Sequence, residues 1–123
     1  MNKQRINVLY VDDEAGNLTA FRATFRREFQ VHTATSAEEG LALLEQHPVH
    51  VVISDQRMPG TTGSQFLAQV RDKYPRTIRM LLTGYSDMEA VVDAINKGGI
   101  YSYCPKPWDS NDLTLRLDPT FEV

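Results

Sequence analysis

Short apolar runs alternate along the chain with segments in which apolar residues recur every three or four positions. The runs that are the length of a strand are Ile6–Val11, Val49–Asp55, Ile78–Leu82 and Ile100–Cys104, and the more polar segment Gln30–Thr35 is interpreted as a weak strand. The central run is β-branched and only a few residues long, which favours a strand buried on both faces over a helix.

The intervening segments have helical spacing. Leu18, Phe21 and Phe25 recur on one helical face, and Ser36 with Glu39 matches a capping box before a stripe that contains Leu41 and Leu44. Two further helices are predicted after the third and fourth strands. The first is Gly63–Tyr74, which stops before Pro75, and the second ends at Lys97 with an inward stripe of Met88, Val91, Val92 and Ile95.

Five alternations of strand and helix predict one α/β domain over residues 1–123, a (βα)5 three-layer sandwich with a parallel sheet. The carboxyl ends of parallel strands meet at one edge of the sheet, where ligands bind in open α/β folds. Pro105 is expected to end the fifth strand or to lie on a free edge. Pro119 ends the last helix early, so this helix is short or atypical and the chain is expected to be a fragment of a longer protein.

Composition excludes several classes of protein. The net charge is -3 with scattered basic residues, which argues against a nucleic-acid groove or a membrane patch. Cys104 is the single cysteine, so no intrachain disulfide can form. There is no signal peptide or membrane-length apolar run in the sequence, so a cytoplasmic location is expected.

Polar residues follow the predicted strands and would gather at one edge of the sheet: Asp12, Asp13, Asp55, Thr83 and Lys106. Three carboxylates brought together repel one another unless a cation offsets them. Oxygen ligands without histidine or cysteine favour Mg²⁺ before Ca²⁺. A metal, a hydroxyl and an ammonium group suit a phosphoryl group, with Asp55 as the nucleophile. Taken alone, Asp55 would more often cap a helix.

The motifs resemble the receiver domains of two-component response regulators. They are the Asp12-Asp13 pair, Asp55 followed by Met58-Pro59-Gly60, Thr83-Gly84 and Lys106-Pro107, in the right order and at the right spacing. The sequences around Asp55 and Lys106 are most similar to those of hydrogenase-type transcription regulators and of receivers joined to cyclic-di-nucleotide phosphodiesterases. The resemblance implies a flavodoxin-like sheet of order 2-1-3-4-5.

The resemblance also implies a mechanism. Asp55 would accept a phosphoryl group from a sensor histidine kinase, a phosphotransfer protein or a small donor such as acetyl phosphate. Asp13 and Asp55 would bind Mg²⁺ (or Mn²⁺) directly, Asp12 through water and Arg57 through its main-chain carbonyl. Lys106 would pair with the phosphoryl group or Asp55, and the bond before Pro107 would be cis.

Signalling would then follow from movements of Thr83 and Tyr103 toward the phosphorylated site, which shift the population between two packings. The output domain would be absent from this chain or a separate effector, and a homodimer is expected from apolar surface near Trp108. Arg57 and Tyr85 are expected to slow hydrolysis of the acyl phosphate by screening it from water, so weak autophosphatase activity is expected and no other enzymatic activity.

Other readings stay open. A Mg²⁺-dependent phosphatase with an Asp nucleophile would normally carry an acid-base Asp two residues later, where this chain has Arg57. A nucleotide or flavin binder would need a phosphate loop where this chain has Asp12-Asp13-Glu14. A receiver that signals through protein contact alone is the third alternative. His32, His47 and His50 lack metal-ligand spacing and are interpreted as structural or surface residues.

Overall fold

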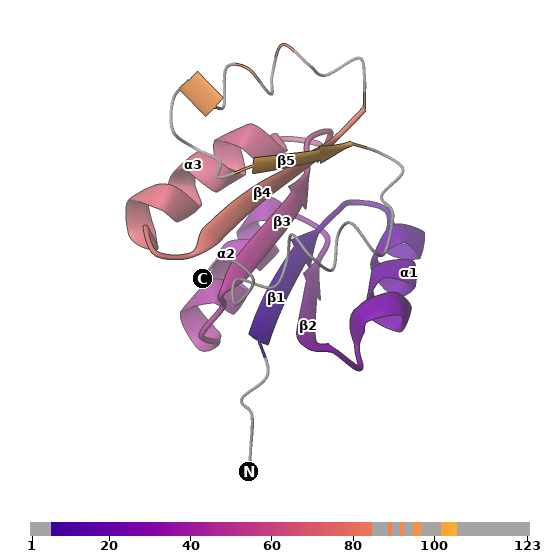
Figure 1. Cartoon of the computed structure of the whole chain (residues 1–123). Helices are drawn as coiled ribbons and strands as arrows, with labels where there is room; N and C mark the ends of the chain where they lie inside the picture. Colours follow the sequence, from indigo (N-terminus) through magenta and orange to yellow (C-terminus); the bar gives the residue numbers. More distant parts are fainter. Residues whose placement is uncertain (1–5, 85–88, 90–91, 93–94, 97–101, 106–123) are drawn as a thin grey trace.

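The computed structural model describes residues 6–84, 89, 92, 95–96 and 102–105, and for residues 102–105 it describes the backbone. In chain order the elements are β1 (Ile6–Val11), α1 (Ala15–Phe25), β2 (Phe29–Ala34), α2 (Ala37–Gln46), β3 (Val51–Asp55), α3 (Gly63–Lys73), β4 (Ile78–Thr83) and β5 (Ser102–Pro105) (Figure 1). No helix within these residues is long and apolar enough to cross a membrane.

The strands form one parallel sheet in the order β2-β1-β3-β4-β5. The predicted strand order and flavodoxin-like class are therefore confirmed. Glu89, Val92, Ile95 and Asn96 are helical. The rest of the predicted fourth helix and the last helix lie outside the described residues, so the complete (βα)5 arrangement stays a prediction.

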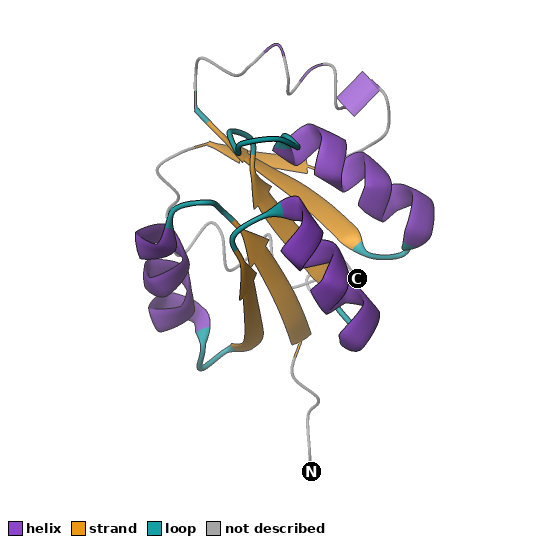
Figure 2. Cartoon of the chain, turned by 180° about the vertical axis from the view of Figure 1, so that it is seen from behind, coloured by secondary structure: helices purple, strands orange, loops and turns teal. Residues whose placement is uncertain are grey.

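Alternation along the strands divides the core into two layers. In β1, Val8 and Tyr10 face the cluster that contains the apolar residues of α1, whereas Leu9 and Val11 face the cluster formed with α2 and α3. Seen from behind, α2 and α3 lie together on one face of the sheet (Figure 2). The sheet is therefore covered on both faces, which explains why β3 is buried along its whole length.

Local signals set most of the element boundaries. Ser36 Oγ accepts a hydrogen bond from the Glu39 amide at 3.1 Å, so the predicted cap of α2 is confirmed. The second half of that capping box is wrong, because the Glu39 carboxylate accepts from the Thr35 amide at 2.6 Å instead. Pro105 ends β5, which is the edge strand of the sheet. Both positions predicted for Pro105 are therefore confirmed.

Three strands differ in their bounds from the prediction. β3 begins at Val51 instead of Val49, β2 is Phe29–Ala34 instead of 30–35, and β4 ends at Thr83 instead of Leu82. β5 is described from Ser102 to Pro105, and the predicted start of this strand at Ile100 lies outside the described residues. His50, the residue before β3, still bonds to both neighbouring strands: its amide donates to the Asn7 carbonyl at 2.9 Å, and its carbonyl accepts from the Ile78 amide at 3.0 Å.

The prediction that Val92 and Ile95 point inward is wrong. Their side chains are 53% and 49% exposed. They are three residues apart and so share one helical stripe. The periodicity of an apolar stripe indicates that its members lie together, but it does not show that another element covers them.

Candidate functional site

Three aspartates meet at the carboxyl edge of the sheet. Asp12 and Asp13 follow β1 and Asp55 is the last residue of β3. One carboxylate oxygen from each lies within 4.8 Å of the others. Asp12 and Asp55 are buried, whereas Asp13 is exposed. The structure therefore brings together the three acids that the sequence placed at this edge.

Strand alternation explains why Asp12 and Asp55 converge. Tyr10 of β1 and Ile53 of β3 are adjacent in the register and belong to the same core cluster. Asp12 and Asp55 each lie two residues further along, so both continue on the α1 side of the sheet. The two neighbouring parallel strands thus deliver their carboxylates to one point.

Asp12 is fully buried and both of its oxygens accept hydrogen bonds. Oδ2 accepts from the Tyr10 hydroxyl at 2.7 Å and from Asn17 Nδ2 at 3.1 Å. Oδ1 accepts from the Glu14 amide at 2.9 Å. These donors compensate for the desolvation of a buried carboxylate and fix its direction.

Tyr10 was not singled out by the sequence analysis. Its ring lies against Phe21 with a centroid distance of 4.5 Å, and the residue is 1% exposed. Burial raises the pKa of the Tyr10 phenol far above its ordinary value, and the hydrogen bond to Asp12 acts in the same direction. The phenol therefore stays protonated and remains a hydrogen-bond donor.

The loop after Asp55 turns sharply into α3. Gly60 has φ of 79°, a left-handed conformation that glycine adopts without strain. Thr62 then caps α3, since its side chain and that of Gln65 form a reciprocal capping box. A Thr followed three residues later by Gln is a sequence signal that would have found this cap.

The first turn of α3 is fixed directly to the end of β3. The Gly63 amide donates to the Gln56 carbonyl at 3.0 Å, and the Ser64 amide donates to Gln56 Oε1 at 2.9 Å. Gln56 is buried, and its own amide continues the strand pairing by donating to Leu82 O at 3.1 Å. The peptide that carries Asp55 is consequently held from two sides.

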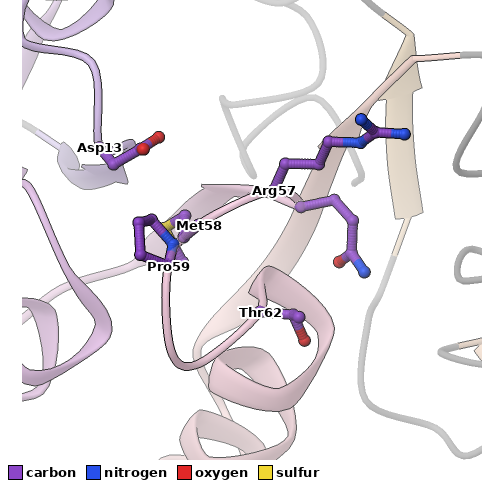
Figure 3. A pocket seen from close by; sticks show the side chains of 6 residues that line it. Asp13, Arg57, Met58, Pro59 and Thr62 are labelled. Atoms are coloured by element: carbon purple, nitrogen blue, oxygen red, sulfur yellow. The ribbon is translucent and has the colours of Figure 1, made fainter.

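A groove of about 490 Å³ opens beside these acids. Its lining comes from the residue after Asp12 and from the loop before α3: Asp13, Gln56, Arg57, Met58, Pro59 and Thr62. Figure 3 shows the exposed Arg57 side chain extending away from Asp13. Asp13 therefore meets solvent at the edge of an open groove.

Thr83 ends β4, the strand beside β3, and is buried. Its hydroxyl donates to the Gly84 carbonyl at 3.2 Å. Thr83 is thus next to the acidic site in the sheet, with its hydroxyl directed to the backbone of its own strand end.

Several predicted site residues cannot be placed. Lys106, Pro107 and Tyr85 lie outside the described residues, as does Trp108. Tyr103 lies in β5, paired with Leu81, but its side chain is outside the described part. The proposed roles of these residues stay predictions.

β2 and the end of α2 bring together two histidines that are distant in the sequence. The rings of His32 and His47 stack with a centroid distance of 4.5 Å, and His32 Nε2 lies 3.2 Å from Asn7 Oδ1. Burial lowers the pKa of His32 below its ordinary value, and the neighbouring His47 and Arg22 add to this effect. This pair is structural, in agreement with the interpretation from sequence.

The aspartate site fits a hard divalent cation. The three converging ligands are all carboxylate oxygens, and one of the acids borders open solvent from which water ligands can come. Mg²⁺ prefers such oxygen sites and retains several waters. Within the described residues, this is the group of acids and histidines that comes close enough to bind a metal.

Comparison with known proteins agrees with this geometry. The profile of the response regulator receiver domain family matches residues 8–118. Over 113 residues the chain is 45% identical to the hydrogenase transcriptional regulatory protein HoxA of Cupriavidus necator, covering 92% of this chain and 23% of that protein. Over 106 residues it is 40% identical to HoxA of Bradyrhizobium diazoefficiens, covering 86% and 22%.

Among solved structures, the signal receiver domain of an HD domain-containing protein from Pseudomonas fluorescens superposes with a TM-score of 0.89 at 36% identity, covering 97% of this chain and 96% of that one. The predicted resemblance to hydrogenase-type regulators is confirmed. The chain spans about a quarter of the length of these curated relatives.

Proposed function

The chain belongs to the response regulator receiver domain family, and from this we propose that Asp55 is a phosphoacceptor whose modification depends on Mg²⁺. The observation that carries the proposal is the convergence of Asp12, Asp13 and Asp55 within 4.8 Å at the carboxyl edge of the sheet. Crowded carboxylates at this edge need a cation, and one of them is then suited to attack a phosphorus atom.

In the proposed reaction, a carboxylate oxygen of Asp55 attacks the phosphorus of a phosphohistidine on a sensor kinase or phosphotransfer protein. A P–O bond forms as the P–N bond breaks, and the electron pair of that bond returns to the imidazole nitrogen of the donor. Acetyl phosphate would react in the same way with acetate as the leaving group. The groove beside Asp13 supplies access for either donor.

Asp12, Asp13, Asp55 and the main-chain carbonyl of Arg57 are the groups proposed to hold Mg²⁺ (or Mn²⁺). The bound ion would neutralise charge on the phosphoryl oxygens. The fixed peptide between Asp55 and Gln56 keeps the nucleophile in place, because α3 bonds to Gln56 through two backbone amides. Lys106 is proposed as the second cation at the site.

The response to phosphorylation is proposed to involve Thr83 and Tyr103. The Thr83 hydroxyl would leave the Gly84 carbonyl, to which it donates here, and donate to a phosphoryl oxygen instead. The added charge would then favour one of two packings of the surface around β5. Arg57 borders the groove and, with Tyr85, is proposed to slow hydrolysis; a Tyr85→Ala domain should lose its phosphoryl group faster.

The output is proposed to be transcriptional. The two HoxA relatives are described as hydrogenase transcriptional regulatory proteins, and the chain matches about a quarter of each. We therefore propose that this receiver controls an output domain or separate effector of that kind. Self-association through apolar surface is a further part of the proposal, and a mass by light scattering that stays monomeric at all concentrations would remove it.

The test is intact mass spectrometry after incubation with acetyl phosphate and Mg²⁺. The mass should rise by one phosphoryl group, and Asp55→Asn or chelation of the metal should abolish the rise. Asp72→Asn is a matched control, because Asp72 is exposed, pairs with Arg71 and lies at the far end of α3. An unmodified wild-type domain would favour a receiver that acts through protein contact alone. Continuous release of phosphate without a stable adduct would favour a phosphatase.

A further inference from the structure

Tyr10 places a hydroxyl group where packing alone does not require one. The residue is 1% exposed and its ring packs on Phe21, as a phenylalanine ring could. A buried hydroxyl is unfavourable unless it is hydrogen-bonded. Its partner here is Oδ2 of Asp12 at 2.7 Å, a short charge-assisted contact. Tyr10 and Asp12 are two residues apart, so strand geometry holds both on the same side of the sheet.

The two oxygens of the Asp12 carboxylate accept different numbers of hydrogen bonds. A carboxylate offers about four lone-pair directions, two on each oxygen. Tyr10 and Asn17 both donate to Oδ2, whereas the Glu14 amide alone donates to Oδ1. Oδ2 is therefore saturated, and one lone pair on Oδ1 is left to accept from a metal-bound water or to bind a cation.

We propose that Tyr10 is a positioning residue for the cation site, which fixes the Asp12 carboxylate so that a single Oδ1 lone pair serves the ion. This inference rests on the proposed function, because it assigns a role at the same site. Hydrogen-bond partners that orient metal ligands commonly change metal affinity or activity by 10–100-fold when removed. Tyr10 and Asn17 act through Asp12 and are not expected to touch the ion.

The test is Mg²⁺ binding, measured by calorimetry and by amide chemical shifts without any phosphoryl donor. Tyr10→Phe removes the hydroxyl and keeps the ring, and it should weaken Mg²⁺ binding about tenfold. Asn17→Ala removes the other donor to the same oxygen from a half-buried position and should weaken binding in the same direction. This second variant keeps the test valid if Tyr10→Phe folds poorly.

Two controls separate positioning from packing. Tyr74→Phe makes the same chemical change at the end of α3 that is remote from the site, and it should leave Mg²⁺ affinity unchanged. In an Asp12→Asn background, Tyr10→Phe should cause no further loss of affinity, because its effect runs through the Asp12 carboxylate.

The inference is overturned if Tyr10→Phe binds Mg²⁺ as tightly as the wild type or more tightly, or if it loses equal affinity in the Asp12→Asn background. Failure of the proposed function is a distinct result. In that case the wild-type domain itself would show no saturable Mg²⁺ binding and no phosphoryl adduct on Asp55.

Discussion

Gly63 lies against the backbone of Asp55 so closely that a Cβ atom at this position would collide with the Asp55 carbonyl oxygen. A Cβ atom on residue 63 would also lie 2.9 Å from Gln56 Cα. Both neighbours are backbone and cannot rotate away. α3 therefore begins with glycine, the residue type that lets its first turn touch the end of β3.

Gly63→Ala should therefore destabilise the domain and disturb the nucleophile. Overpacking of a rigid site costs about 1–3 kcal/mol, and the shift falls on the peptide that carries Asp55. Urea unfolding should show the loss, and the rate of phosphorylation by acetyl phosphate should fall with it.

Gly16→Ala is the matched control. Nothing lies within 4 Å of the position where its Cβ would be, and Gly16 is in α1. Alanine is a better helix former than glycine by about 0.5–1 kcal/mol, so this variant should be slightly more stable. If both variants change stability equally, close contact between Gly63 and Asp55 is not the cause.

Local sequence predicts much of the arrangement of strands and acids at the carboxyl edge of the sheet. β1 was predicted with the bounds that the structure gives, because an apolar run ends there in consecutive acids. The meeting of Asp12 and Asp55 also followed from sequence, since parallel strands end at one edge. The close packing of Gly63 could not be predicted in the same way, because it arises from contact between elements.

Other features depend on contacts that periodicity does not encode. His32 and His47 are distant in sequence, and only the folded sheet brings their rings together. The two-residue spacing of Tyr10 and Asp12 places them on one side of a strand. The sequence does not show that the Tyr10 hydroxyl is buried and donates to Asp12. Val92 and Ile95 form a helical stripe that remains half exposed.

Mg²⁺ should stabilise the folded domain. A ligand that binds only the folded state at a hundred times its dissociation constant adds about 2.7 kcal/mol. The melting temperature should therefore rise with added Mg²⁺ and fall again with a chelator. Ca²⁺ should give a smaller rise at equal concentration if the site prefers the smaller ion.

Asp13→Asn should have opposite effects on two quantities: less charge repulsion among the three aspartates, and weaker stabilisation by Mg²⁺. Two charges about 4 Å apart in water interact by about 1 kcal/mol, so removal of the exposed Asp13 charge should stabilise the metal-free domain by a similar amount. The same variant should lose most of the stabilisation by Mg²⁺. An undiminished response to Mg²⁺ would show that Asp13 is not a ligand, and Asp72→Asn should behave as the wild type.

Gln56→Met should weaken the start of α3. The side chain keeps a similar size but loses Oε1, which accepts from the Ser64 amide at 2.9 Å. Gln56 is buried and Ser64 is half-buried, so an amide left without its acceptor costs about 1–3 kcal/mol. Denaturant unfolding measures this loss. Gln65→Met is the control, since Gln65 is exposed and water can replace its contact with the Thr62 amide; equal losses would contradict the assignment.

The stacked histidines should make the stability of the domain depend on pH. Burial first, and then the proximity of His47 and Arg22, lower the pKa of His32 from its ordinary value of 6.5. Below pH 6.5, His32 therefore binds a proton more readily in the unfolded chain than in the folded domain. The free energy of unfolding should decrease as the pH falls from 6.5 toward the lowered pKa, with a slope of at most about 1.4 kcal/mol per pH unit for this group.

Urea unfolding between pH 5 and 8 measures this slope, and the comparison of two variants assigns it. His32→Gln should remove the contribution of His32 in full. His47→Gln should reduce it only in part, because burial of His32 remains while the neighbouring imidazole is gone. Phosphorylation of Asp55 should be unaffected by either change, since His32 pairs with Leu9 on the α2 side of the sheet, whereas Asp12 and Asp55 continue on the α1 side. A slope that both variants leave unchanged would place the titrating group elsewhere.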